Sequence, residues 1–326
     1  MKPSRLALTL AVLAAVGLAG CGGTDAPERS SPAAAAAAGT FPVEVTNCGR
    51  TLRFDKPPTR VVSGWPTSTE LLIALGAADR LVGQYNTASG GPHPPYAEAY
   101  RRVAVLGQNA PSREALLAAR PELIWADGSY LFDGQQLPTI EDLNAQGIRV
   151  LILSGFCTDD ATAARVRDVD TDIAALGAIL GIPDKASQLR ADIDRRLADV
   201  AAKVAGTDPV PVAMVSTFDK AIYTYDGVYT DIARMAGARN IYAGALPKGK
   251  YFHEVSVEDL TRRDPATLVY LRSGGEDQAA ARAWLTATLP TVQAVRSNRI
   301  VFLPQSDSTN LAGVEGVTTL AAALHP

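Results

Sequence analysis

Residues 111–126 have the sequence PSREALLAARPELIWA, and residues 255–272 have the sequence VSVEDLTRRDPATLVYLR. Both stretches contain Ser-x-Glu-x-Leu, with a proline nine residues after the serine. Serine is a common helix N-cap, the proline ends the helix, and the apolar residues that follow predict a buried strand. The same helix–strand unit therefore occurs twice, 144 residues apart. This repeat indicates two similar lobes.

The rest of the chain alternates short apolar strands with capped helices. A second, weaker repeat pairs residues 69–77 with residues 230–238, since each contains a threonine followed by an acid and ends in Gly-Ala. Such alternation predicts an α/β fold with parallel sheets flanked by helices. We expect two strands within 43–54, further strands at 60–63, 81–83, 123–126, 150–153, 212–216, 267–271 and 299–303, and helices at 67–76, 112–120, 140–146, 229–237, 256–263, 279–285 and 311–324.

One long amphipathic helix is expected between the two halves, over residues 184–205. Its apolar residues recur at helical spacing and form one stripe, namely Leu189, Ile193, Leu197, Val200 and Val204. A helix of this length can join two lobes at a fixed separation; a surface helix of a single domain would show the same periodicity. The expected organisation is a first lobe over 41–160, a helical segment over 161–206 and a second lobe over 207–326.

Composition excludes several classes of function. The 326 residues are 47% hydrophobic and 20% charged, with a formal net charge of −3, which gives no basic field for nucleic acid. Only three histidines and three cysteines are present, which disfavours a multi-histidine metal site or a zinc finger. No nucleotide-binding, metalloprotease or serine-hydrolase motif is present, so we expect no enzyme and no cofactor or metal site. His93, in a proline-rich loop, is expected at the surface, and no spacing supports Asp127 or Asp307 as a catalytic carboxylate.

The N-terminus predicts export and lipid anchoring. Residues 1–20 have a charged start, a short apolar stretch and small residues before Cys21, as in a lipoprotein signal peptide. Cys21 is then the lipidated first residue of the mature chain; ordinary secretion with a coincidental cysteine is the alternative. Residues 21–40 are rich in Gly, Ser, Pro and Ala and are expected to be a flexible tether. The body would be anchored to the membrane on its extracytoplasmic face.

The other two cysteines, Cys48 and Cys157, are expected to form a disulfide, because thiols in one exported domain usually pair. Two buried free thiols are the alternative. The pair lacks Cys-x-x-Cys spacing, so its role would be structural rather than redox.

Aromatic and polar residues directly follow the expected strands. The carboxyl ends of strands in open α/β sheets border the ligand crevice, so two facing lobes would line a shared cleft with these residues. Any single one of them could instead belong to the core or the rim. The expected ligand-binding residues are Trp65, Tyr85, Tyr130, Phe156, Phe218, Tyr251, Arg272 and Ser306.

Together these features resemble the helix-linked class of ABC-transporter substrate-binding lipoproteins, which carry ferric siderophores, haem or cobalamin. The resemblance covers residues 41–324 and is carried by Asn47-Cys48-Gly49-Arg50, Pro58-x-Arg60-Val61-Val62, the 69–76 segment and the two Ser-x-Glu-x-Leu motifs. It implies that Glu114 and Glu258 contact arginines of the membrane permease. Stabilisation of the helix N-termini is the simpler role for both acids. The resemblance also implies nearly rigid lobes with a small closure.

The resemblance does not identify the ligand of this protein. An aromatic cleft with Arg272, and with Lys248 or Lys250 near it, suits a flat or bulky anionic ligand, and a ferric siderophore is the expectation. Cobalamin, haem and a deazaflavin precursor are alternatives. The expected partners are an ABC permease and ATPase, with the protein itself a monomer that binds no nucleic acid. A surface sensor of the same fold, and a metal-ion-binding relative, are the other classes; the latter would need histidines or carboxylates at the strand ends.

Overall fold

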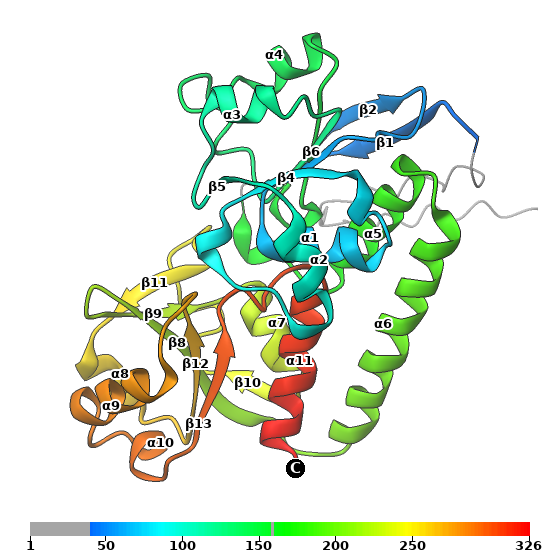
Figure 1. The fold of residues 1–326 in the computed structure, drawn as a ribbon. Helices are drawn as coiled ribbons and strands as arrows, with labels where there is room; N and C mark the ends of the chain where they lie inside the picture. Colours follow the sequence, from blue (N-terminus) through cyan, green and yellow to red (C-terminus); the bar gives the residue numbers. More distant parts are fainter. Residues whose placement is uncertain (1–39, 158–159) are drawn as a thin grey trace, which may run out of the picture. The chain divides into compact units, whose positions relative to one another are not determined.

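Each of the two repeats forms a helix followed by a strand, and each strand lies inside its own β-sheet (Figure 1). In the first, α3 (Arg113–Ala118) leads to β6 (Leu123–Ala126); in the second, α8 (Val257–Arg263) leads to β12 (Thr267–Arg272). Ser112 and Ser256 are the helix N-caps. Their Oγ atoms accept hydrogen bonds of 3.1 Å from the backbone N–H groups of Ala115 and Asp259. The repeat therefore reflects the same local structure in both sheets.

The computed structural model describes residues 40–157 and 160–326. The expected signal peptide, Cys21 and all of the expected tether except Thr40 lie outside these residues.

The first sheet has five parallel strands in the order β5-β4-β3-β6-β7. An antiparallel hairpin of β1 and β2 precedes this sheet in the sequence. The elements are β1 (Val43–Asn47), β2 (Arg50–Phe54), β3 (Val61–Ser63), α1 (Pro66–Ala74), β4 (Leu81–Tyr85), α2 (Ala97–Arg102), β5 (Val105–Gly107), α4 (Ile140–Ala145) and β7 (Arg149–Ile152), together with α3 and β6.

The second sheet is mixed, which corrects the expectation of parallel sheets. Its order is β11-β9-β8-β12-β13, with β10 also paired to β8; β9 and β11 are antiparallel to their neighbours. The turn from β8 to β9 contains Asp219 and Lys220, whose φ angles are +47° and +67°. Two such residues form a tight hairpin turn, but Asp-Lys lacks the glycine that usually signals one in a sequence. The elements are β8 (Val210–Phe218), β9 (Ala221–Tyr225), α7 (Val228–Met235), β10 (Ala238–Asn240), β11 (Phe252–Val255), α9 (Gln278–Thr288), α10 (Gln293–Arg296), β13 (Ile300–Pro304) and α11 (Asn310–Leu324).

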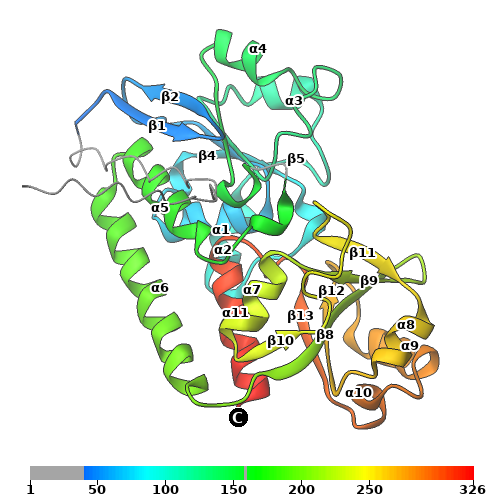
Figure 2. The ribbon, with the colours of Figure 1, turned by 180° about the vertical axis from the view of Figure 1, so that it is seen from behind.

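The long helix joins the two sheets, as expected. Helix α5 (Asp168–Ile179) follows the first sheet, and α6 (Pro183–Val204) then leads directly to β8 of the second (Figures 1 and 2). Ile193, Leu197 and Val200 are buried on its apolar side. On α11, Glu315 forms a 2.8 Å ion pair with Arg196, which ties the joining helix to the last helix of the chain.

One continuous apolar core runs between the two sheets. It includes Leu71 and Trp125 of the first sheet's elements, Ile173 of α5, and Val269 and Val314 of the second sheet's elements. Two smaller apolar clusters cover the other faces of the sheets. The two lobes therefore share their largest core.

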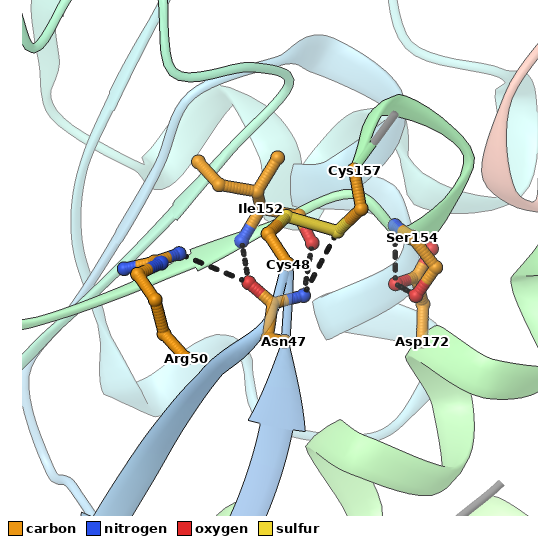
Figure 3. The surroundings of a disulfide bond; sticks show 7 residues. All are labelled: Asn47, Cys48, Arg50, Ile152, Ser154, Cys157 and Asp172. Carbon is orange, nitrogen blue, oxygen red and sulfur yellow. Dashed lines mark hydrogen bonds between the residues drawn. A yellow bond between two sulfur atoms is a disulfide. The ribbon is translucent and has the colours of Figure 1, made fainter. Parts of the chain in front are cut away.

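The expected disulfide between Cys48 and Cys157 is present, with a sequence separation of 109 (Figure 3). Beside it the Asn47 side chain donates to the Ile152 carbonyl at 2.7 Å and accepts from the Ile152 N–H at 2.8 Å. These bonds hold the tip of the β1–β2 hairpin against the end of β7. The bridge thus fixes the segment that follows β7, where residues of the cavity described below are found.

Within the described part of the chain, no helix combines the length and the apolar character needed to cross a membrane.

Candidate functional site

A cavity of about 600 Å³ lies where the carboxyl ends of strands from both sheets meet. Trp65 follows β3, Asp127 and Tyr130 follow β6, Phe156 follows β7, and Ser306 follows β13. This is the position at which open α/β sheets bind ligands, because the loops after the strands diverge there. The lining residues are Trp65, Ala88, Ser89, Asp127, Gly128, Ser129, Tyr130, Leu153, Phe156, Val228, Tyr229, Tyr251, Ser273, Gly274, Gln305, Ser306, Ser308 and Thr309.

Five of the eight expected ligand-binding residues line this cavity: Trp65, Tyr130, Phe156, Tyr251 and Ser306. The aromatic side chains among them offer large, stiff apolar surfaces. Phe156 and Tyr251 also pack edge to face, with ring centroids 6.5 Å apart. The cavity wall is therefore aromatic, with hydroxyl and amide groups between the rings.

The other three, Tyr85, Phe218 and Arg272, do not line the cavity, which corrects the expectation for each. Tyr85 is fully buried against Gly64, where a Cβ atom would meet its hydroxyl at 2.5 Å. Phe218 ends β8 at the tight turn and is 68% exposed. Arg272 bonds the carbonyl of Glu276 with its guanidinium group. All three are the last residues of their strands, so they belong to the sheets and not to the loops that line the cavity.

Sequence reasoning missed Tyr229 as a lining residue and gave Asp127 no binding role. Tyr229 lies in the first turn of α7, and its hydroxyl donates to the Gln305 carbonyl at 3.1 Å. Asp127 directly follows β6, so the rule that selected the aromatic residues would also have found it. Tyr229 carried no such signal, because the rule covered only residues that follow strands.

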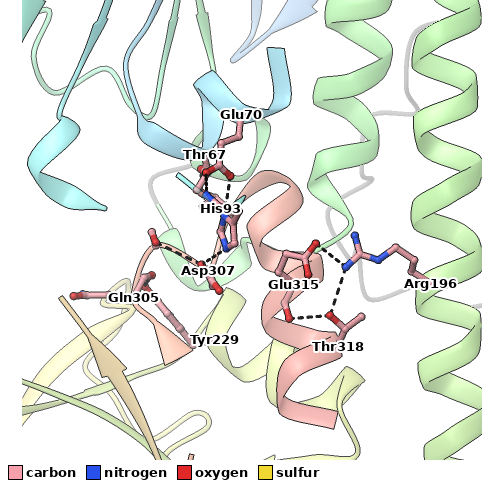
Figure 4. Close-up of polar contacts among 11 residues, drawn as sticks. Thr67, Glu70, His93, Arg196, Tyr229, Gln305, Asp307, Glu315 and Thr318 are labelled. Atoms are coloured by element: carbon pink, nitrogen blue, oxygen red, sulfur yellow. Dashed lines mark hydrogen bonds and ion pairs between the residues drawn. The ribbon is translucent and has the colours of Figure 1, made fainter. Parts of the chain in front are cut away.

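His93 is a link between the lobes rather than a surface residue, which corrects the sequence expectation (Figure 4). Its Nδ1 atom is 2.9 Å from Glu70 Oε2 of α1, and its Nε2 atom is 3.2 Å from Asp307 Oδ1, after β13. Glu70 also accepts the backbone N–H of His93 at 2.6 Å. Hydrogen bonds to Asp307 and Glu70 raise the pKa of His93 to about 10, so the ring is a cation at neutral pH.

Uncharged groups extend the same contact between the lobes. The Thr67 hydroxyl lies 3.1 Å from the Thr309 hydroxyl, and the Asn310 side-chain amide donates to Thr67 and Ser68 at 3.1 and 3.3 Å. Thr67 and Ser68 begin α1, while Asn310 begins α11. The helices that start at the cavity are therefore joined to each other.

Glu114 and Glu258 are both exposed, each in the first turn of a capped helix. Hydrogen bonding to the helix's own backbone and to the capping serine lowers the pKa of each carboxyl, so both are negatively charged at neutral pH. In Figures 1 and 2 their helices, α3 and α8, lie on the side away from α6. Each lobe thus presents one equivalent acid to solvent.

Residues 40–157 and 160–326 contain no group of three or more histidine, cysteine or carboxylate side chains arranged to hold a metal ion.

The comparisons with known proteins agree with this geometry. The sequence matches the periplasmic binding protein family over residues 61–306. The chain belongs to this family.

The relatives of this periplasmic binding protein include transport components. The vitamin B12-binding protein of Photorhabdus laumondii is 28% identical over 226 residues, which are 68% of this chain and 73% of that protein. An uncharacterized ABC transporter substrate-binding lipoprotein of Bacillus subtilis, YvrC, is 26% identical over 326 residues, 97% of this chain and 95% of that one. Both relatives are named as binding proteins, and YvrC is named as a component of an ABC transporter.

Solved structures show the same two-lobed fold. A periplasmic binding protein from Veillonella parvula has a TM-score of 0.76 at 23% identity, covering 87% of this chain and 97% of that one. The structure described as an ABC-type Fe3+-hydroxamate transport system from Saccharomonospora viridis has a TM-score of 0.72 at 26% identity, covering 88% and 100%.

Proposed function

We propose that this protein is a lipid-anchored, extracytoplasmic binding protein that captures a ferric siderophore and delivers it to an ABC importer. It would act without catalysis and without a resident cofactor, with the metal arriving as part of the ligand. The observation that carries the proposal is the aromatic cavity of about 600 Å³ at the strand ends of both lobes. Its rings and hydroxyl groups suit a bulky chelate, and ligand pockets commonly have this size.

A corrinoid is the second candidate ligand. The observation in its favour is the relation to vitamin B12-binding proteins, of which the Photorhabdus laumondii protein is 28% identical. Both candidates are metal chelates with broad apolar faces, so both would use the same aromatic wall.

Replacing Trp65 by alanine should weaken binding of the ligand by at least about tenfold, or about 1.4 kcal/mol. The reason is that Trp65 contributes an aromatic face to the cavity wall. Calorimetric titration of the folded protein with ferrioxamine B, cyanocobalamin and haem measures the effect. Phe218→Ala is the matched control, because Phe218 is exposed outside the cavity and its removal should leave the affinity unchanged. Absence of saturable binding by any of these ligands would contradict the proposed function.

Reversing both Glu114 and Glu258 to arginine should weaken docking to the cognate permease by at least about tenfold while leaving ligand affinity unchanged. The basis is that each acid would face a cation on the permease, so reversal places like charges together. Binding to permease in nanodiscs measures it. Glu141→Arg is the control, because Glu141 is also an exposed acid in a first helical turn but lies outside the repeated motif. If the double variant docks as tightly as the wild type, the two acids do not contact the permease and serve only to stabilise their helices.

A further inference from the structure

The lining of the cavity carries a net negative charge in the described structure. Among the described lining residues Asp127 is the only charged side chain, and the others are apolar, aromatic, hydroxyl or amide groups. The cations that sequence analysis placed near the site, Arg272, Lys248 and Lys250, are not part of the lining. Asp307 is close to Ser306 in sequence, but His93 pairs with it. The cavity therefore contains one negative charge without a described partner cation.

No cation pairs with Asp127 in the described part of the chain, so only hydrogen bonds act on its charge. Its Oδ2 atom accepts a 2.7 Å hydrogen bond from the Tyr130 hydroxyl, whereas no donor with hydrogen-bond geometry reaches its buried Oδ1 atom in the described structure. The Tyr130 ring lies over Gly128, where a Cβ atom would meet it at 2.8 Å. Burial raises the pKa of Asp127 to about 6, which still leaves the carboxyl mostly ionised at neutral pH.

A lone ionised carboxylate next to an aromatic cavity favours ligands that supply positive charge. Charges interact more strongly across a poorly hydrated site than in water, because the effective dielectric constant is lower. A ligand cation, or an N–H donor, near Asp127 would offset the burial of its charge, while a ligand carboxylate would be repelled. The titratable groups that interact with Asp127 in the described structure are Tyr85, Tyr130 and Tyr251. Burial raises the pKa of each above the ordinary value of 10, so all three are neutral at pH 7.

We propose that Asp127 makes the cavity selective for ligand charge, so that the natural solute is a cationic or neutral metal chelate and not an anionic one. This inference rests on the proposed function and narrows its ligand class. It replaces the anionic ligand expected from Arg272, which lies outside the cavity lining.

Two sets of matched chelates test the selectivity on the full-length protein by calorimetry. The hydroxamate set is ferrioxamine B, which carries an ammonium group, its neutral N-acetyl derivative and its anionic N-succinyl derivative. The corrinoid set is aquacobalamin below the pKa of its bound water, where it is cationic, then neutral cyanocobalamin and an anionic monocarboxylic acid of cyanocobalamin. Whichever set binds, we expect the cationic or neutral member to bind at least about tenfold more tightly than the anionic member.

Asp127→Asn should reduce this preference to within about threefold, because it preserves shape and removes the charge. Asp127→Ser is a second, smaller replacement that should do the same. Tyr130→Phe should keep the preference, because the carboxylate remains. Asp208→Asn removes an exposed charge outside the cavity lining and should also keep it.

The outcomes separate the two proposals. Saturable binding with no dependence on ligand charge, or an unchanged preference in both Asp127 variants, would overturn the role of Asp127 and leave the proposed function standing. Failure of every member of both sets to bind the folded protein would instead overturn the proposed function.

Discussion

Replacing His93 by alanine should lower the free energy of unfolding by about 3–5 kcal/mol. Glu70 and Asp307 are almost completely buried, at 1% and 5% exposure, and His93 is the cation between them. Without it, two buried carboxylates remain with no cation to offset their charge, although the backbone N–H of residue 93 can still bond Glu70. Because Glu70 lies on α1 and Asp307 follows β13, the loss would also loosen the contact between the lobes.

The effect of this substitution should depend on pH. The pKa of His93 is 6.5 in an ordinary setting and about 10 in the folded protein, first because of the Asp307 hydrogen bond and then because of Glu70. A group whose pKa is raised on folding stabilises the protein fully below its unfolded pKa, and this contribution is lost as the pH rises through the folded value. The difference in stability between wild type and His93→Ala should therefore be largest below pH 6.5 and shrink toward pH 10.

Urea unfolding followed by circular dichroism, repeated across this pH range, measures the difference. His253→Ala is the matched control, since His253 is exposed on β11 and its removal should change stability little. Equal unfolding midpoints for wild type and His93→Ala would show that the two buried carboxylates do not depend on the imidazolium.

Removing the Cys48–Cys157 disulfide should lower the free energy of unfolding by about 2–5 kcal/mol. The bridge closes a segment with a sequence separation of 109 residues, and a cross-link across so long a loop restricts the unfolded chain strongly. Urea unfolding with and without a reducing agent gives the value. The double replacement Cys48→Ala with Cys157→Ala should match the reduced wild type.

The double variant is also the control for the reductant, because its own stability should not respond to reducing conditions. An unchanged midpoint for reduced wild type would mean that Asn47, which bonds Ile152 through both ends of its side chain, holds the hairpin tip without the bridge.

Much of the fold could be predicted from the sequence because its signals are local. Ser112 and Ser256 cap helices in the structure just as their spacing to the following proline suggests, and the apolar stripe of residues 189–204 lies on a real joining helix. The pairing of Cys48 with Cys157 needed only the count of cysteines and the expected compartment. Apart from the disulfide, none of these features depends on contacts between elements that are distant in the sequence.

The parts that could not be predicted depend on such contacts. Nothing near His93 in the sequence indicates that Glu70 and Asp307 lie on either side of its ring, 23 and 214 residues away along the chain. The orientation of Tyr85 depends on Gly64, which directly follows the neighbouring strand β3 and has no side chain to block the tyrosine ring. The strand β9 depends on a hairpin turn with an unusual sequence at Asp219 and Lys220. Position after a strand located the cavity, but the three-dimensional packing decided which side chains enter it.

The continuous core has a mechanical consequence for how such a protein can release what it holds. Leu71, Trp125, Val269 and Val314 belong to one apolar cluster, so swinging the lobes widely apart would bring that cluster into contact with water. Exposure of apolar surface costs about 25 cal/mol per Å², which makes a wide opening expensive relative to thermal energy. We therefore expect the two lobes to move only slightly relative to each other. A wide opening would need free energy from a partner that binds both lobes at once.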